Sequence, residues 1–177
     1  MRNIGTIRAN PLVVNGSALC IAIFTYLAIY RGIWDISPPQ WAKGPGFLLL
    51  IVLAGMLLLL HEAIHMLTAN LLTSGAGASL HIRMLVWECR LKKPLARNGY
   101  ILYALAPAIV IGGASFISFY IVNSADYKFL AALAFVIGIS SAGGDYWFVA
   151  KILRFPRRSM ILDNGMETDV QLADDSD

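Results

Sequence analysis

Residues 57–67 read Leu-Leu-Leu-Leu-His-Glu-Ala-Ile-His-Met-Leu, a His-Glu-x-x-His motif set inside a strongly apolar stretch. His61 and His65 are four residues apart, so on a helix their imidazoles share one face and can reach one ion. Imidazole and carboxylate groups are expensive in hydrocarbon, and the ones found there usually have a functional partner. We therefore interpret this motif as a metal site rather than as ordinary polar residues on a helix surface.

Glu62 is the acidic member of the motif and directly follows the first histidine. From that position a glutamate can lean over the open coordination position of a metal held by the two histidines. A carboxylate there can take a proton from water and pass it to a leaving amine, which is general-base catalysis. We therefore assign the catalytic role to Glu62.

The composition indicates a membrane protein. Of the 177 residues, 58% are hydrophobic, more than a soluble chain of this size can hide from water. We predict an all-α integral membrane protein in which residues 1–158 form a single membrane-embedded domain. About four transmembrane helices are expected, over residues 11–30, 45–73, 100–122 and 129–153. No basic face interleaved with aromatic residues is present outside the loops, so we expect no nucleic-acid partner.

The remaining segments are polar or mixed. In the loop before the third span, residues 80–84 alternate between apolar and polar side chains, which favours a short β-strand or hairpin. The chain ends in an acidic stretch, and we expect residues 159–177 to form a flexible cytoplasmic tail. Cys20 falls in a span and Cys89 in a loop, a placement that supports neither a disulfide framework nor a zinc-cysteine site.

Basic residues indicate the orientation in the membrane. The loop over residues 74–99 holds five Lys or Arg residues, and four more lie at the exit of the last span: Lys151, Arg154, Arg157 and Arg158. The other two loops hold three between them. By the positive-inside rule, we predict a multi-pass protein of the cell membrane with both termini and the 74–99 loop in the cytoplasm.

The predicted spans bury very few ionisable groups. Glu62 and Asp145 are the only acids in their interior, and His61 and His65 are the only histidines. Two buried carboxylates on different helices beside two imidazoles are most economically explained by one shared cation. His65 and Asp145 also lie at matching depths, about 12–14 Å from the predicted cytoplasmic ends of their helices at ~1.5 Å per residue.

Two imidazoles and one carboxylate, with water in the fourth position, make a tetrahedral catalytic zinc site, in which zinc lowers the pKa of that water to ~7. His81 is the rival third ligand, and we prefer Asp145 because a histidine in a polar loop needs no special explanation. Pro107 is read as a kink that can also admit water beside the site. Ser140 and Ser141 are read chiefly as helix-packing hydroxyls, with oxyanion stabilisation the lesser alternative.

With these residues in place, the chain resembles the small four-span membrane proteins known as putative zincin peptidases, and more distantly the site-2 protease class of intramembrane metalloproteases. The resemblance rests on residues 61–65, 105–107 and 140–145, and it covers most of residues 45–155. It implies a third zinc ligand from an aspartate on a later span. It also implies a strand near the active site that binds the substrate edge-on, a role that residues 79–91 can fill.

The favoured hypothesis is a zinc-dependent intramembrane or juxtamembrane protease. It would hydrolyse a peptide bond of a membrane protein or peptide near the cytoplasmic face of the lipid bilayer. The alternative is a non-catalytic metal-binding membrane protein, acting as a sensor, a transport element or a scaffold derived from a peptidase. Glu62 favours the protease over a scaffold, and the scarcity of polar groups in the outer halves of the spans disfavours transport.

Overall fold

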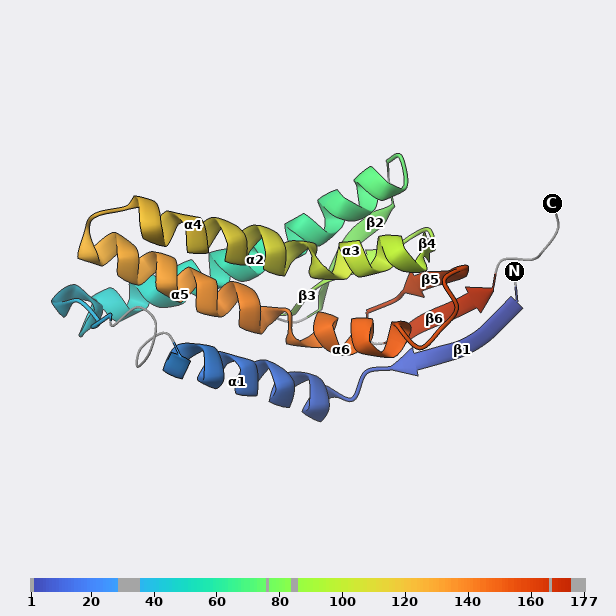
Figure 1. Cartoon of the computed structure of the whole chain (residues 1–177), viewed down its shortest axis with the longest axis horizontal. Coiled ribbons are helices and arrows are strands. Elements are labelled where there is room, and N and C mark those ends of the chain that lie inside the picture. Colours follow the sequence, from blue (N-terminus) through green and yellow to red (C-terminus); the bar gives the residue numbers. More distant parts are fainter. Residues whose placement is uncertain (1, 29–35, 76, 84–85, 166, 173–177) are drawn as a thin grey trace. The chain divides into compact units, whose positions relative to one another are not determined.

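The computed structural model describes residues 2–28, 36–75, 77–83, 86–165 and 167–172 (Figure 1). Within these residues, four helical segments are long and apolar enough to cross a membrane: Pro11–Ala28, Gly46–Leu72, Arg97–Ile121 and Ala125–Ile152. This confirms the predicted all-α membrane class. Residues 29 and 30 of the first predicted span lie outside the described residues.

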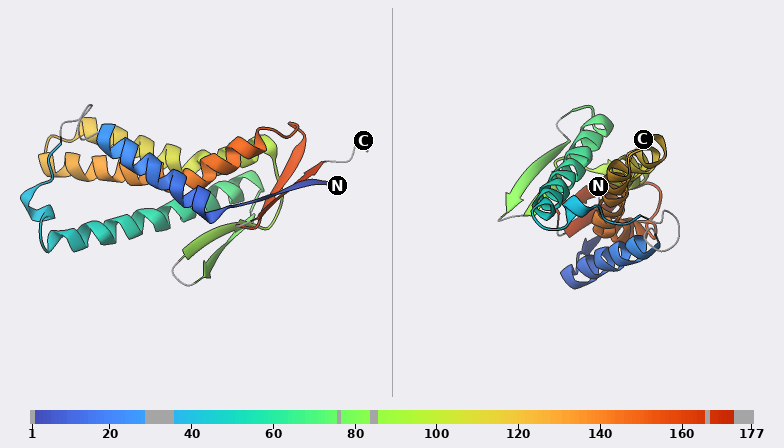
Figure 2. Two further views of the ribbon diagram at one scale, coloured as in Figure 1. Left: turned by 90° about the horizontal axis from the view of Figure 1, so that it is seen from below. Right: turned by 90° about the vertical axis from the view of Figure 1, so that its left-hand side faces the viewer.

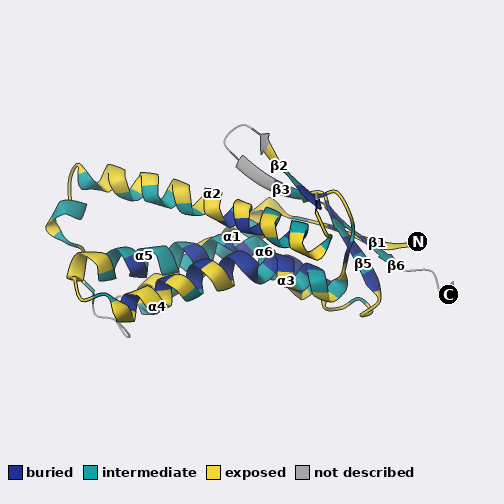
Figure 3. Ribbon diagram, turned by 90° about the horizontal axis from the view of Figure 1, so that it is seen from above, coloured by how far each residue is buried: buried dark blue, intermediate teal, exposed yellow. Residues whose placement is uncertain are grey.

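The first two spans are each one continuous helix. None of the residues of α1 (Pro11–Ala28) is buried, and the first half of α2 (Gly46–Leu72) is exposed or half-buried, as its yellow and teal colouring in Figure 3 shows. A surface of exposed Leu, Ile and Phe side chains suits contact with lipid chains rather than water. The 27 residues of α2 span roughly 40 Å, enough to cross the hydrocarbon layer and extend beyond it.

The third and fourth spans are interrupted helices. In the third, α3 (Arg97–Pro107) passes into a π-helical segment, Ala108–Gly112, and then into α4 (Gly113–Ile121). Pro107 lacks the amide hydrogen that would continue the α-helical ladder, and the helix type changes directly after it. In the fourth, α5 (Ala125–Ser141) ends at Ala142 and α6 (Gly143–Ile152) follows.

The described chain divides into two compact units. The first comprises Met1–Val14, Glu62–Ala106 and Gly144–Asp177, and the second comprises Asn15–His61 and Pro107–Gly143. In the second unit, Phe119 of α4 packs with Ala131 and Ala132 of α5. Our expectation of a single domain over residues 1–158 stays a prediction.

A four-stranded antiparallel sheet lies in the first unit. Its strand order is β1-β6-β5-β4, with β1 at Arg2–Arg8, β4 at Leu95–Ala96, β5 at Ser159–Asp163 and β6 at Glu167–Leu172. Ile161 and Val170 are fully buried and share a core with Tyr100 and Ile152.

The prediction of a flexible tail is therefore wrong for residues 159–165 and 167–172. Every second residue of β5 is buried, and Asp163-Asn164-Gly165 makes the turn into β6, with Gly165 at a φ of 89°. Such a turn between two short apolar runs is a hairpin signal, and the acidic end of the chain obscured it. Residues 173–177 lie outside the described residues.

A separate two-stranded sheet confirms the predicted hairpin. Strands β2 (Ala78–Arg83) and β3 (Val86–Leu91) are antiparallel, with Ala78 opposite Leu91. Figure 2 shows this green hairpin as a ribbon distinct from the larger sheet, with its base next to that sheet. Residues 84 and 85, at the turn, lie outside the described residues.

The buried face of β5 provides a test of the sheet. Changing Ile161 to Ala should lower the free energy of unfolding by about 2–5 kcal/mol, because it removes apolar contacts and leaves a cavity. The matched control is Ile4→Ala in β1, where the side chain is 37% exposed and a change within about 0.5 kcal/mol is expected. The measurement is denaturant unfolding of the full chain in detergent. Equal effects of the two substitutions would contradict the burial of β5.

Membrane orientation can be tested by cysteine labelling. The natural thiol of Cys89 is a poor reporter, because it is buried and its burial raises its pKa to about 11. The exposed positions Lys93 and Asn123 are better sites for engineered cysteines. On intact cells, a membrane-impermeant maleimide should label Asn123→Cys, while Lys93→Cys should react only after permeabilisation. The reverse pattern would invert the predicted topology.

Candidate metal centre

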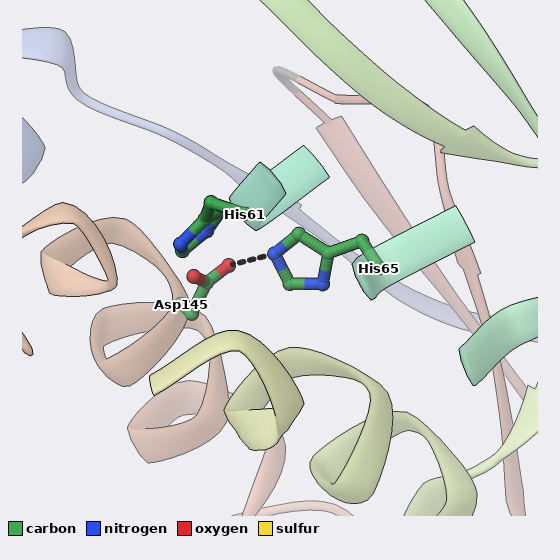
Figure 4. A group of neighbouring side chains, drawn as sticks. All are labelled: His61, His65 and Asp145. Atoms are coloured by element: carbon green, nitrogen blue, oxygen red, sulfur yellow. Dashed lines mark ion pairs between the residues drawn. The ribbon is translucent and has the colours of Figure 1, made fainter. Parts of the chain in front are cut away.

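Three side chains that the sequence singled out lie close together. His61 and His65 come from α2 and Asp145 from α6, and their ligand atoms all lie within 4.8 Å of one another (Figure 4). Among the described residues, no other set of three His, Cys, Asp or Glu side chains meets this condition. The two histidines are buried, whereas the Asp145 side chain is 22% exposed.

The donor atoms suit zinc in type and in spacing. The distance from His65 Nε2 to Asp145 Oδ1 is 3.5 Å. Two donors about 2.0–2.1 Å from a tetrahedral zinc would be roughly 3.4 Å apart. Two imidazoles and one carboxylate also match the donor set of catalytic zinc sites that leave a fourth position open.

His65 is oriented by Tyr103. Its Nδ1 lies 3.0 Å from the backbone carbonyl oxygen of Tyr103, so Nδ1–H donates to that oxygen and Nε2 faces Asp145. The rings of His65 and Tyr103 are also in contact, with centroids 4.7 Å apart. An outer partner of this kind fixes both the tautomer and the plane of a ligating imidazole.

Pro107 explains why this carbonyl is available. In an α-helix the carbonyl of residue i accepts from the amide of residue i+4, and the residue four positions after Tyr103 is Pro107. Proline has no amide hydrogen, so the Tyr103 carbonyl can accept from His65 instead. We interpreted Pro107 from the sequence as a kink, and its relation to Tyr103 was missed. The sequence did contain a signal for this relation, because Pro107 stands four residues, about one helical turn, after Tyr103.

His61 has a comparable partner in Ser141. The distance from Ser141 Oγ to His61 Nδ1 is 3.1 Å, and the same hydroxyl donates to the carbonyl of Gly138 at 3.3 Å. The hydroxyl therefore accepts from His61 Nδ1–H, which leaves Nε2 as the metal-binding atom. Ser140, by contrast, donates to the Val136 carbonyl of its own helix at 2.7 Å, the packing role we expected of both serines.

Glu62 lies outside the group of ligand atoms and is held by β3. Its Oε2 accepts a hydrogen bond of 2.9 Å from the backbone N–H of Cys89, and the Cys89 carbonyl accepts one of 3.4 Å from the Tyr103 hydroxyl. Tyr103 thus has two roles. Its carbonyl accepts a hydrogen bond from His65, and its hydroxyl donates to β3, the strand that holds Glu62. The sequence could not indicate these backbone contacts, because they depend on the register of the hairpin.

The rival ligand His81 is elsewhere. It is exposed on β2, with its Nε2 3.0 Å from the hydroxyl of Ser79, and it is absent from the group of ligand atoms. Gly143, two residues before Asp145, permits close helix packing. A Cβ on Gly143 would lie 2.7 Å from the Cα of Ala18, so the partner that requires this glycine is α1.

A buried acid that the sequence analysis missed joins α3 to the large sheet. Asp163 of β5 accepts a 2.7 Å hydrogen bond from the Tyr100 hydroxyl and a 2.8 Å bond from the backbone N–H of Gly165. Burial raises the pKa of Asp163 to about 6, although both hydrogen bonds act in the opposite direction. We missed it because the sequence placed Asp163 in the expected flexible tail.

Comparisons with known proteins agree with the motif. A family model described as putative zincin peptidase matches residues 54–160, a range that contains His61, Glu62, His65 and Asp145. No curated protein and no solved structure matches the chain. The more distant similarity to site-2 proteases stays a prediction. Since the matched range covers more than half of the 177 residues, the chain belongs to the putative zincin peptidase family.

Proposed function

We propose that this protein is a zinc-dependent peptidase that cuts a membrane protein or membrane-associated peptide near the cytoplasmic ends of its spanning helices. The observation that carries the proposal is the convergence of His61, His65 and Asp145 in a chain of a zincin family, with Glu62 on the same helix. The family supports a zinc peptidase in general. The membrane-embedded site of cleavage and the residue roles are our inference.

The three converging side chains would hold the metal. When bound there, zinc would polarise the scissile carbonyl and make water a usable nucleophile at neutral pH. Tyr103 and Ser141 would keep the two imidazoles in the tautomer that offers Nε2. The carboxylate of Asp145 would supply the negative charge that a divalent cation needs in an apolar surrounding.

Glu62 would move the proton. The Cys89 N–H orients its carboxylate, and a carboxylate has lone pairs enough to accept that bond and a proton as well. As general base it would take the proton of the attacking water, and as general acid it would return it to the leaving amine. Steps of this kind contribute typically ~10²–10⁴-fold to a rate.

The outer edge of β3 offers a place for the substrate. Cys89 directs its N–H to Glu62 and its carbonyl to the Tyr103 hydroxyl, away from its partner Leu80 on β2. This edge of β3 therefore faces the proposed general base. Because both main-chain groups of Cys89 are already bonded, an extended peptide would pair with other main-chain groups next to Cys89 on this edge, and it would lie beside Glu62 with little dependence on its sequence.

The ligand assignment predicts how zinc binding responds to substitution. His61→Ala, His65→Ala and Asp145→Ala should each weaken zinc binding by more than the 10–100-fold typical of losing an outer-shell partner. The control is His81→Ala, which should bind zinc like the parent. The measurement is the metal content of purified protein equilibrated in zinc buffers. Full zinc retention by Asp145→Ala would remove this residue from the site.

A second prediction separates catalysis from metal binding. Glu62→Gln should keep zinc but lose general-base catalysis, because glutamine is nearly isosteric and cannot take the proton. It should therefore retain uncut substrate in a crosslinking pull-down. The captured partner is then tested for cleavage in membranes by the parent and by Glu62→Gln.

The matched control for this test is Glu167→Gln, which alters an exposed glutamate paired with Arg8. It should cleave the captured partner at the parental rate, while Glu62→Gln should be slower by ~10²-fold or more. Equal rates for the parent and Glu62→Gln would contradict the peptidase proposal and favour a metal-binding or scaffold role.

A further inference from the structure

The first unit contains an open hollow of about 390 Å³ that the peptidase proposal does not use. Its walls include Arg8 of β1, Trp147 and Lys151 of α6, and Arg154 and Phe155, which follow α6. We propose that this hollow binds the phosphate group of an anionic phospholipid. The proposal does not depend on the peptidase function.

The hollow carries a positive charge. Its lining contains three cations and no carboxylate. One of the cations is compensated, because Arg8 Nε pairs with Glu167 Oε1 at 3.0 Å. At the border of the hollow, the Thr6 hydroxyl donates a hydrogen bond of 2.9 Å to the carboxylate of Asp169. Within the described part of the chain, Lys151 and Arg154 have no carboxylate partner. Two uncompensated cations at one hollow favour an anion with several acceptor oxygens.

Lys151 is held in place for such a ligand. Its ammonium lies 5.3 Å from the centroid of the Trp147 ring, one helical turn earlier, a distance suited to a cation–π interaction. The interaction uses the charge of the ammonium and leaves its three N–H groups to donate to acceptors. A phosphate can accept from this point charge and from the planar guanidinium of Arg154 together.

The position of the hollow favours a lipid as the source of the phosphate. Lys151 lies in the last turn of α6, where the fourth candidate span ends at Ile152. The ends of spanning helices lie at the level of the lipid headgroups, where tryptophan is also enriched. Basic pockets at this level bind anionic headgroups. The aromatic rings of Trp147 and Phe155 add apolar walls that free phosphate would not need.

The test uses the full chain in a neutral detergent. It is titrated with dihexanoyl-phosphatidylglycerol, with dihexanoyl-phosphatidylcholine and with inorganic phosphate. The rise in unfolding temperature with ligand concentration gives the apparent Kd of each. The parent should bind phosphatidylglycerol more tightly than either of the other two ligands.

Two double variants locate the binding. Lys151→Gln/Arg154→Gln should raise the Kd for phosphatidylglycerol about 25-fold, since a surface cation contributes about five-fold. The control Lys92→Gln/Lys93→Gln removes the same charge from exposed positions outside the hollow and should change the Kd less than about two-fold.

Three results would overturn the proposal. Equal weakening by the two double variants would mean diffuse electrostatic attraction instead of a site. Equal affinity for phosphatidylcholine would remove the role of net negative charge. Equal affinity for inorganic phosphate would assign the hollow to a free anion and not to a lipid.

Discussion

The hydrogen bond between His65 Nδ1 and the Tyr103 carbonyl is the interaction on which the candidate metal centre depends. A buried imidazole in a helix suited to lipid needs a partner for its N–H, and an α-helix normally has no carbonyl to spare. Pro107 resolves this by removing the amide that would otherwise occupy the carbonyl of Tyr103. A defect in one helix thereby satisfies a polar group on another and directs Nε2 toward Asp145.

Tyr103 also connects the two chemical roles we propose. Its carbonyl orients a proposed ligand, while its hydroxyl contacts the Cys89 carbonyl on the strand that holds Glu62. The hairpin β2–β3 is consequently part of the proposed catalytic apparatus as well as a surface for substrate. A peptide that displaced β3 would move Glu62, whereas one that paired with its edge would leave the carboxylate in position. The second arrangement is the one that our proposed mechanism requires.

The sequence predicted those features that follow from local pattern and from the cost of burying charge. Apolar runs of span length predicted the four helices. The shortage of ionisable groups inside them predicted that Asp145 shares a site with His61 and His65. Alternating residues gave the hairpin. What the sequence did not provide depends on partners distant along the chain. The N-terminal strand β1 pairs with β6 near the other end of the chain, and neither short strand shows a strong signal alone.

The prediction of a flexible tail failed for the same reason. It rested on the acidic composition of the end of the chain and overlooked a short alternating pattern, which forms stable strands only when a sheet is available.

The central claim remains that His61, His65 and Asp145 hold one zinc ion. X-ray absorption spectroscopy of the zinc-loaded full chain tests it most directly. We expect two imidazole nitrogens and oxygen donors at about 2.0–2.2 Å, with loss of one oxygen donor in Asp145→Ala. A sulfur donor at about 2.3 Å, or fewer than two imidazoles, would contradict the account.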